Sequence, residues 1–325
     1  MSIDQGYPRL LGDIGGTNAR WAWQASADAA LQDISVQPCQ ASASLLESAN
    51  NYLASTGHAD PQCAAIGIAT AVTGDAVRMT NNSWTFSIKE LEKALGLQHC
   101  LVINDFTALA MSLPALGASD LWAVGSGTAI KGAPIALIGP GTGLGVSGLL
   151  MSDSGHYLAL SGEGGHATLA PADEIESTLL TCLRARFGHV SAERVLSGPG
   201  LVDLYRAICE LDGRSALDLS PADVTAAAKA GTDADCLASA HYFASFLGNV
   251  AGNLALTLGA RGGLYVGGGV VPQLGKAFNA GLFRQRFEEK GRFQDYLAPI
   301  PTWIITASTP ALIGASRALD LITTT

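Results

Sequence analysis

The stretch Val102-Ile103-Asn104-Asp105-Phe106-Thr107-Ala108 decides how this chain is interpreted. A short apolar run, 101–103, stops at an amide and a carboxylate, and a helix-forming run, 106–113, follows it. This pattern predicts a strand that ends where a helix begins, which is the place where open α/β sheets bind ligands. Asn104 and Asp105 are therefore candidate ligand-binding residues, although an Asn-Asp pair is also a common helix cap.

The expected position of Asp105 also predicts its charge. At a helix start its side chain would lie near unpaired backbone N–H groups and the positive end of the helix dipole. Both favour the ionised carboxylate, so we predict that Asp105 has a low pKa. An ionised carboxylate beside an amide can bind a hydroxyl group and accept its proton.

At 325 residues the chain is too long for one modest core, and we expect two domains. Hydrophobic residues make up 48% of the chain, and the net charge of -9 argues against nucleic-acid partners, which require clusters of Lys and Arg. The six cysteines are scattered without metal-ligand spacing, as expected in a reducing compartment. We find neither a signal peptide nor a membrane-spanning run, so we expect a cytoplasmic protein without a membrane partner.

A glycine turn interrupts the apolar run of residues 10–23. Its sequence is Asp13-Ile14-Gly15-Gly16-Thr17-Asn18-Ala19-Arg20. Paired glycines let the backbone approach a ligand and leave N–H groups free to point at phosphate, and Thr17 and Asn18 add side-chain donors. Asp13 is a candidate Mg²⁺ ligand through water, because Mg²⁺ prefers oxygen ligands and keeps much of its hydration shell. A lone Gly-Gly pair would favour an ordinary β-hairpin, but the longer pattern Asp-x-Gly-Gly-Thr-Asn-x-Arg is more specific for phosphate.

The same theme returns at residues 135–146, where an apolar strand leads into Gly141-Thr142-Gly143 and a second apolar strand. This segment is a second candidate phosphate-binding hairpin. The weak internal repeat suggests two similar α/β halves, each of which offers one such hairpin to a ligand.

A third glycine-rich turn, Gly162-Glu163-Gly164-Gly165-His166, places an acid and an imidazole three residues apart. The glycines permit a sharp turn, so both side chains can face one ligand. No second His or Cys stands nearby to complete a zinc site, and we expect Glu163 and His166 to bind hydroxyl groups. A tight turn with a structural His is the alternative. Glu193 is a further candidate ligand, with a surface ion pair to Arg194 as its alternative.

The remaining pattern predicts a small domain, 1–113 plus 307–325, and a larger domain, 114–306. The sequence predicts a buried strand over 64–69 and further strands over 264–266 and 303–306. It predicts helices over 45–54, 88–95, 174–187, 201–211, 221–230, 236–258 and 310–321. Gly267-Gly268-Gly269 follows a strand and leaves a flat surface for adenine and ribose. Loop 80–84 either contacts a substrate or is held in place by a packed Trp84. We expect segment 288–293 to be a solvated surface.

Taken together, the motifs resemble the bacterial glucokinase family of the hexokinase, actin and Hsp70 superfamily over nearly the whole chain. The segments that carry this resemblance are 12–20, 103–108, 139–145, 162–166 and 191–200. It implies an α/β, two-domain actin-like ATPase (ribonuclease H-like) fold with a central ligand cleft. It also implies a homodimer that uses ATP and Mg²⁺ to phosphorylate glucose at its 6-hydroxyl in glycolysis.

The resemblance also implies a role for each matching position. Asp105 becomes the general base, and the sugar hydroxyls are bound by Asn104, Asp105, Glu163, His166 and Glu193. Phosphates are held by Asp13 (through Mg²⁺), Gly15, Gly16, Thr17, Asn18, Gly141, Thr142 and Gly143, and the adenosine faces Gly267, Gly268 and Gly269. Two alternatives remain open: a kinase of the same fold that acts on mannose or fructose, and a sugar sensor without turnover.

Overall fold

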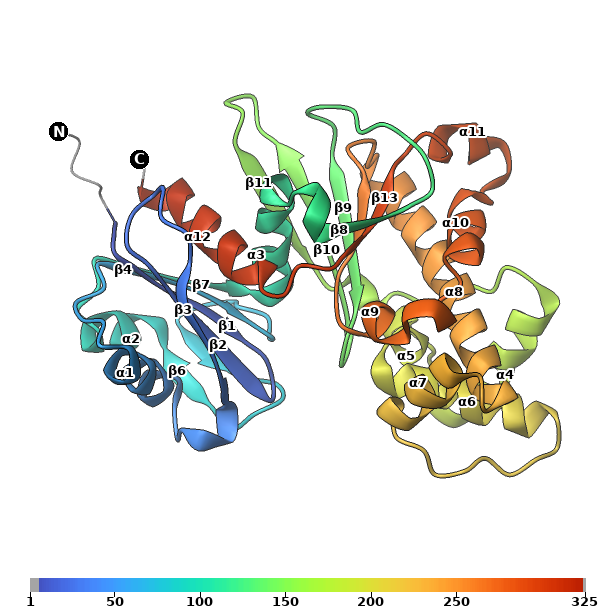
Figure 1. Cartoon of the computed structure of the whole chain (residues 1–325). Coiled ribbons are helices and arrows are strands. Elements are labelled where there is room, and N and C mark those ends of the chain that lie inside the picture. The colour runs from blue at the N-terminus through green and yellow to red at the C-terminus, as the bar shows by residue number, and fades with distance from the viewer. Residues whose placement is uncertain (1–5, 324–325) are drawn as a thin grey trace. The chain divides into compact units, whose positions relative to one another are not determined.

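The computed structural model describes residues 6–323 and contains two compact units, each built around its own sheet (Figure 1). One unit contains the described residues up to Leu116, the segment Ser152–Ser161 and the described residues from Ala307 onward. The other contains Gly117–Met151 and Gly162–Thr306. Over the described residues, no helix has both the length and the apolar character that a membrane crossing requires.

The first unit is a mixed sheet with helices on both faces. Its strands lie in the order β3 (Gln32–Pro38), β2 (Asn18–Gln24), β1 (Arg9–Ile14), β4 (Cys63–Ile68) and β7 (His99–Asn104). β1 and β2 form an antiparallel hairpin, whereas β1, β4 and β7 run parallel. The other elements of this unit include η1 (Cys39–Ala41), α1 (Leu45–Thr56), β5 (Ala76–Arg78), β6 (Thr85–Ser87), α2 (Ile88–Ala94), α3 (Asp105–Ser112), η2 (Leu113–Ala115) and α12 (Pro310–Thr323).

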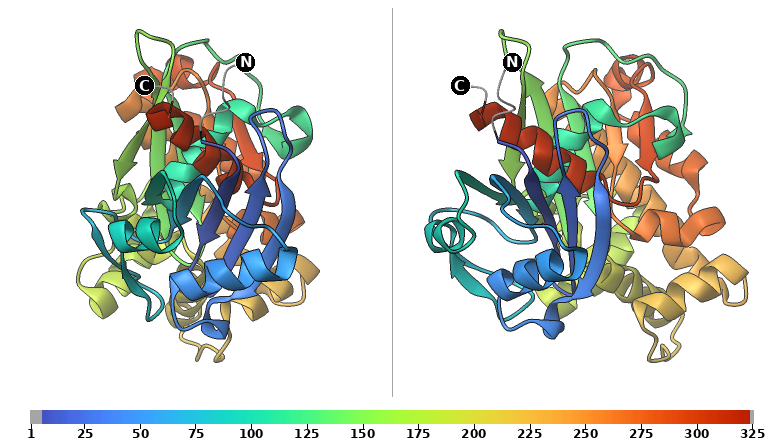
Figure 2. Two further views of the ribbon diagram at one scale, coloured as in Figure 1. Left: turned by 90° about the vertical axis from the view of Figure 1, so that its left-hand side faces the viewer. Right: turned by 60° about the vertical axis from the view of Figure 1, so that its left-hand side comes forward.

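Alternation along β1 sends neighbouring side chains into two different cores. Leu10 packs in a cluster with Leu45 and Tyr52 of α1, whereas Leu11 packs with Leu312 of α12. Successive side chains of a strand point to opposite faces, so Asp13 shares the face of Leu11, which α3 and α12 cover. Figure 2 shows α1 and α12 on opposite sides of this sheet.

Helix α12 is tied closely to α3 and β1. A Cβ atom on Gly314 would lie 1.7 Å from the Ala108 carbonyl oxygen, so only glycine allows the two helices to cross this closely. Arg9 of β1 is buried and donates hydrogen bonds to the Ser316 carbonyl (2.9 Å) and the Asp320 carboxylate (2.7 Å). The predicted helix at 310–321 therefore packs against the sheet that contains the first strands.

The second unit packs a mixed sheet against a group of helices. Its strands include β10 (Leu144–Met151), β9 (Ile135–Pro140), β12 (Leu264–Val266), β13 (Thr302–Ile305) and β8 (Leu121–Val124), adjacent in that order. Phe243 and Phe246 of α8 are fully buried in one core with Ile138 of β9, as the three- and four-residue spacing predicts. All but the last residue of β11 (Tyr157–Gly162) belongs to the first unit, in its segment Ser152–Ser161. The remaining elements of the second unit are η3 (Ala118–Asp120), η4 (Gly164–His166), α4 (Glu174–Phe187), α5 (Ala192–Val195), α6 (Gly198–Leu211), α7 (Pro221–Ala230), α8 (Ala234–Leu258), α9 (Val270–Leu274), η5 (Gly275–Ala277), α10 (Ala280–Glu288), η6 (Gly291–Phe293) and α11 (Gln294–Leu297).

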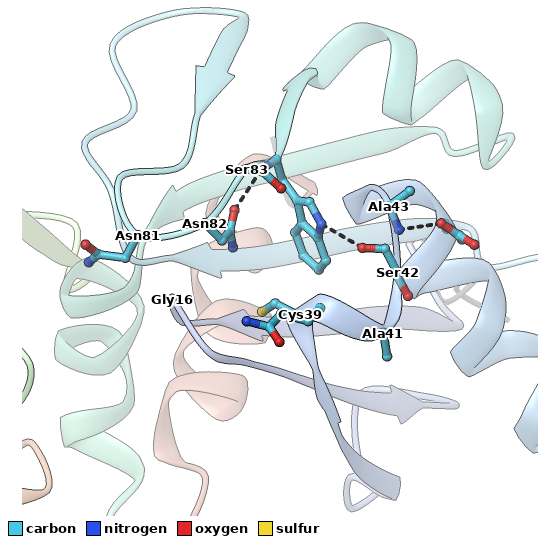
Figure 3. A pocket seen from close by; sticks show the side chains of 11 residues that line it. Gly16, Cys39, Ala41, Ser42, Ala43, Asn81, Asn82 and Ser83 are labelled. Atoms are coloured by element: carbon cyan, nitrogen blue, oxygen red, sulfur yellow. Dashed lines mark hydrogen bonds between the residues drawn. The ribbon is translucent and has the colours of Figure 1, made fainter.

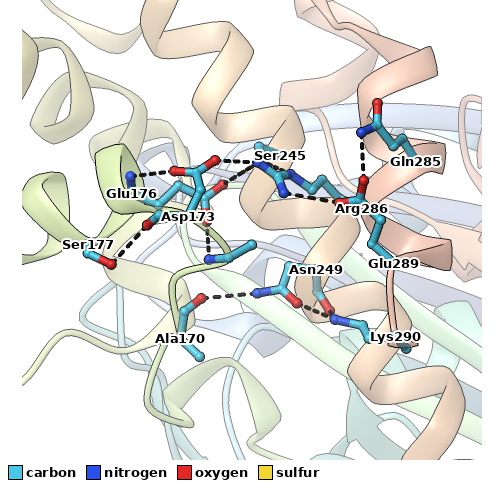
Figure 4. Close-up of polar contacts among 11 residues, drawn as sticks. Ala170, Asp173, Glu176, Ser177, Ser245, Asn249, Gln285, Arg286, Glu289 and Lys290 are labelled. Atoms are coloured by element: carbon cyan, nitrogen blue, oxygen red, sulfur yellow. Dashed lines mark hydrogen bonds and ion pairs between the residues drawn. The ribbon is translucent and has the colours of Figure 1, made fainter. Parts of the chain in front are cut away.

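A buried polar network joins α4, α8 and α10 within this unit (Figure 4). The fully buried Glu176 carboxylate accepts a hydrogen bond from the Ser245 hydroxyl, which in turn accepts one from Arg286 Nε (2.9 Å). Lys290 Nζ donates to the Asn249 carbonyl (3.0 Å), and partial burial lowers the pKa of this lysine. The expectation that segment 288–293 is a solvated surface is therefore wrong for Lys290, because α8 supplies its partners.

Candidate active site

Asn104 and Asp105 lie where β7 ends and α3 begins, as the sequence predicts. The Asn104 side-chain oxygen accepts hydrogen bonds from the backbone N–H groups of Phe106 (2.9 Å) and Thr107 (3.3 Å). Its Nδ2 atom donates to the Thr70 carbonyl (3.4 Å). The helix-cap interpretation is thus confirmed for Asn104, and its side chain also stabilises the ionised carboxyl of Asp105.

Asp105 differs from the sequence prediction in its charge state. Its Oδ1 accepts a hydrogen bond from the Phe106 N–H (2.9 Å), as expected at a helix start. Burial and the negative charge of Asp13 nevertheless raise its pKa to about 7. The predicted low pKa is wrong, because desolvation and a like charge outweigh the stabilising hydrogen bonds.

The order of the strands brings Asp13 close to Asp105. It is in register with Gly67 of β4, and a Cβ atom on Gly67 would lie 3.1 Å from Ala108 Cβ and 3.5 Å from Asp105 Cα. Glycine at this position lets the first turn of α3 pack directly on the sheet. Asp13 Oδ2 accepts a hydrogen bond from Arg20 (3.1 Å), and burial raises its pKa although Arg20 opposes that rise.

The two glycines of the first hairpin have different surroundings. The turn is closed by a hydrogen bond from the Gly15 N–H to the Asn18 carbonyl (2.9 Å), and neither glycine has a positive φ. A Cβ atom on Gly16 would lie 2.6 Å from Asn81 Cβ, whereas one on Gly15 would meet only the Asn18 oxygen at 3.5 Å. The neighbouring loop therefore requires glycine at position 16, and the side of Gly15 remains open.

Loop 80–84 is held by its tryptophan. Trp84 is 3% exposed, and its indole N–H donates to the Ser42 carbonyl (3.1 Å). Its backbone N–H donates to the Asn82 side chain (2.9 Å), and a polar cavity of about 530 Å³ lies between this loop, Gly16 and Cys39 (Figure 3). Of the two interpretations of the loop, the one with a packed Trp84 is confirmed.

The second hairpin joins β9 to β10. It again contains an open glycine, beside which a Cβ atom would have space, and a filled glycine, beside which a neighbouring residue occupies that space. The Gly141 N–H donates to the Gly143 carbonyl (2.8 Å), while the N–H groups of Thr142 and Gly143 have no partner within residues 6–323. A Cβ atom on Gly141 would meet nothing within 4 Å, whereas one on Gly143 would lie 2.4 Å from Glu193 Oε2. The two unpaired N–H groups are available to an anion.

Glu193 faces this hairpin rather than Arg194. Its Oε2 accepts a hydrogen bond from the Leu144 N–H (2.9 Å), and its Oε1 lies 4.0 Å from His166 Nδ1. The Arg194 guanidinium lies instead over the ring of Phe187, 4.5 Å from its centroid. Glu193 and His166 are therefore neighbours, as expected for two ligands of one substrate.

A cavity of about 430 Å³ in the second unit contains three of the predicted residues: Thr142, His166 and Glu193. Glu163 is exposed and does not line it. Asp203 does line it, and burial raises the pKa of this carboxyl against the effect of three nearby arginines. Asp203 belongs to the apolar helix α6, where no glycine or acid-imidazole motif marks it, and sequence reasoning missed it.

The triple-glycine turn after β12 packs on the end of β9. The Gly267 N–H donates to the Ile138 carbonyl (2.8 Å). Gly268 has φ +76°, and a Cβ atom there would lie 2.2 Å from the Pro140 oxygen, so both conformation and space require glycine. Gly268 and Gly269 are exposed, which leaves bare backbone beside the second hairpin.

The two α/β units, the paired glycine hairpins and the acidic strand end define a two-domain protein with the actin-like fold of the sugar kinases. The family model described as glucokinase matches residues 10–321, and the chain belongs to the glucokinase family. It is similar to the glucokinases of Aromatoleum aromaticum (52% identity over 97% of this chain and 95% of that one) and Chromobacterium violaceum (50%, 98% and 90%). The crystal structure of a glucokinase from an Antarctic psychrotroph superimposes with a TM-score of 0.89 at 35% identity, covering 98% of this chain and all of that one.

Proposed function

We propose that this protein transfers the γ-phosphoryl group of ATP to the 6-hydroxyl of glucose, which yields glucose 6-phosphate and ADP. Membership in the glucokinase family supports the overall reaction. The observation that carries the proposal is the Asp105 carboxyl at the start of α3, with its pKa raised to about 7. A carboxylate of this strength at a ligand-binding strand end suits the transfer of a hydroxyl proton.

Asp105 acts as the general base. Phosphoryl transfer depends on alignment and on neutralisation of charge more than on covalent help from the protein. Asp105 orients the 6-hydroxyl and accepts its proton while the new P–O bond forms. A base with its pKa near 7 is well matched to neutral pH, because much of it is ionised and its affinity for the proton is higher than that of an ordinary aspartate.

The sugar hydroxyls are bound by Asn104, Asp105, Glu163, His166 and Glu193. The Asn104 side chain lies beside the Asp105 carboxyl, and Glu193 offers Oε1 because Oε2 is occupied by the Leu144 N–H. A missing or inverted hydroxyl would leave such a group unpaired, at roughly 1–3 kcal/mol per contact. Several contacts of this kind would favour glucose over mannose or fructose.

The phosphates of ATP bind to the two glycine hairpins. In the second hairpin, the N–H groups of Thr142 and Gly143 are the donors, and Gly141 gives a phosphate room to approach. In the first hairpin, Gly15 also leaves room for a phosphate, and Gly16 contributes its backbone. Thr17 and Asn18 add polar side chains. Gly267, Gly268 and Gly269 face the adenosine.

Asp13 fits a water-mediated contact to Mg²⁺. Its carboxylate lies close enough to Asp105 to raise the pKa of that residue, and its hydrogen bond with Arg20 offsets part of the negative charge that the two carboxylates bring together. Mg²⁺ in phosphoryl-transfer sites takes one or two carboxylates together with phosphates and water. When bound, the ion would neutralise charge on the β- and γ-phosphates.

A coupled assay of ATP consumption with glucose, mannose and fructose tests the proposed function. We expect kcat/KM for glucose to exceed that for the other hexoses by at least ~10-fold, since each unpaired hydroxyl contact weakens transition-state binding. Equal efficiency with mannose would refute the proposed sugar contacts. Glucose binding without ATP consumption would favour a sugar sensor.

We also propose a cytoplasmic homodimer with a role in glycolysis, supported by membership in the glucokinase family. Light scattering coupled to size-exclusion chromatography would measure the mass in solution. A mass of one chain at micromolar concentration would contradict the dimer.

A further inference from the structure

We infer that the second hairpin positions the Glu193 carboxylate, and that Gly143 is a positioning residue for sugar binding. This inference rests on the proposed function, because it takes Glu193 to be a glucose ligand. It assigns Gly143 a task beyond its contact with phosphate: the absence of a side chain at this position leaves the space that Glu193 occupies.

Two contacts of the hairpin fix the carboxylate of Glu193. The Leu144 N–H donates to Oε2 over 2.9 Å, and the space of a side chain at position 143 is filled by the same oxygen, 2.4 Å from where a Cβ atom would lie. Gly143 does not have a positive φ. Space alone therefore favours glycine here, and the occupant of that space is the proposed sugar ligand.

Hydrogen bonds fix the backbone on either side of Glu193. The Ala192 N–H donates to the Ala167 carbonyl (2.9 Å), and the Gly198 N–H donates to the Gly141 carbonyl (2.8 Å). These bonds hold the start of α5 and the start of α6, which lie on either side of Glu193, against neighbouring segments. A methyl group added at position 143 must therefore displace the carboxylate itself.

The same strand also positions the second sugar ligand of this unit. A Cβ atom on Gly165 would lie 2.1 Å from the Leu144 carbonyl oxygen, so the turn that carries His166 packs directly on the hairpin. His166 Nδ1 then lies 4.0 Å from Glu193 Oε1. Because Oε2 is bound to the backbone, the hairpin determines that Oε1 is the oxygen left to a glucose hydroxyl.

The chain offers a matched pair of substitutions to test this inference. Gly141→Ala and Gly143→Ala each add one methyl group to the same turn, but only the second meets Glu193. We expect Gly143→Ala to raise the Kd for glucose, measured by calorimetry without nucleotide, by at least ~10-fold, the size of effect that one lost hydrogen bond to a charged group gives. Gly141→Ala should leave this Kd within about twofold and raise the KM for ATP. A glucose Kd within twofold of wild type for Gly143→Ala would overturn the inference.

A double-mutant cycle shows whether Gly143 acts through Glu193. In a Glu193→Ala background the added methyl meets no carboxylate, so Gly143→Ala should change the glucose Kd by less than about twofold. An equal loss in both backgrounds would overturn the inference. If Gly143→Ala does not fold, Glu193→Ala should restore folding in the double variant, and failure to do so would also overturn it.

The failure of the proposed function gives a different result. If wild type binds glucose without phosphorylating it, the proposed reaction fails while the cycle still measures positioning. If Glu193→Ala leaves the glucose Kd unchanged in an active enzyme, Glu193 is not a sugar ligand and the inference is wrong. If Glu193→Ala weakens binding and Gly143→Ala does not, only the positioning role is wrong.

Discussion

The two Gly-Thr hairpins are alike in sequence and differ in what lies beside them. In the β1–β2 hairpin, the filled glycine is Gly16, and its neighbour is Asn81 of a loop pinned by Trp84. In the β9–β10 hairpin, the filled glycine is Gly143, and its neighbour is the carboxylate of Glu193. The filled glycine of the first hairpin thus makes room for a loop of the fold. The filled glycine of the second makes room for a proposed substrate ligand.

Each hairpin also contains one glycine whose side is open. Gly15 and Gly141 have no close protein neighbour and no positive φ, so the folded chain itself tolerates a methyl group at both positions. This contrast teaches that glycines in one motif serve two separate purposes. One glycine makes room for a side chain of the protein, and the other leaves its backbone accessible to a ligand.

The largest expected effect concerns the first unit, where Asp13 of the β1–β2 hairpin lies near the proposed base. Asp105→Asn should lower kcat by at least ~10²-fold, within the range for general bases, with glucose affinity changed far less. Steady-state kinetics and calorimetry measure the two quantities. Asp28→Asn, at an exposed carboxylate of the same unit, is the control and should have no effect. Turnover of Asp105→Asn within tenfold of wild type would remove Asp105 from this role.

The pH profile tests the electrostatics of the same region. With the pKa of Asp105 at about 7, kcat/KM for glucose should rise with pH up to about 7, because only the ionised carboxylate accepts a proton. Below that value we expect a loss of about tenfold per pH unit. A profile that stays flat down to pH 5 would show that Asp105 titrates as an ordinary aspartate.

The same pKa shift has a consequence for stability with a definite sign. The folded state binds the Asp105 proton more tightly than the unfolded chain does, so this residue's contribution to stability falls as pH rises from about 4 toward about 7. Above pH 7, Asp105→Asn should therefore unfold at a higher urea concentration than wild type. An equal or lower midpoint for the variant at pH 8 would contradict the raised pKa.

The open and filled glycines of the first hairpin should respond differently to a methyl group. Gly15→Ala should raise the KM for ATP by about tenfold without a change in melting temperature, as for one lost phosphate contact. Gly16→Ala should lower the free energy of unfolding by roughly 1–3 kcal/mol, because Asn81 must move. Asn81→Gly should restore that stability. Equal behaviour of the two alanine variants would break the comparison.

The smallest expected effect concerns the ion pair that flanks the first hairpin. The Arg20 side chain is 36% exposed, so its pair with Asp13 is screened by water. Arg20→Gln should lower the free energy of unfolding by less than about 1 kcal/mol. Urea denaturation of both proteins measures this difference, and a loss of several kcal/mol would mean that the pair is far less hydrated than its exposure indicates.

Local signals explain which parts of the fold the sequence predicts. The predicted helices 174–187 and 221–230 match α4 and α7 at both ends. Asp173 caps α4 by accepting from the Glu176 N–H, and Ser220 and Asp223 form a capping box at α7. These signals lie within a few residues of the helix that they start, so a single sequence contains them.

Long-range proximity explains what the sequence does not predict. The pKa of Asp105 depends on Asp13, which reaches it only because β4 with its Gly67 lies between their strands. Likewise, the anchor of Glu193 is the backbone of Leu144 from another segment. The motifs identify the chemical groups, whereas their charge state and exact partners follow from strand order and packing.

Helix α12 has a consequence for how the chain folds during synthesis. Leu11 of β1 is covered by Leu312 and Leu319, and Arg9 finds its partners on the same helix. A ribosome makes the N-terminal strands long before it makes these residues. The nascent sheet must therefore keep one apolar face uncovered until residues 310–323 have been synthesised, which makes it a natural client for chaperones during that interval.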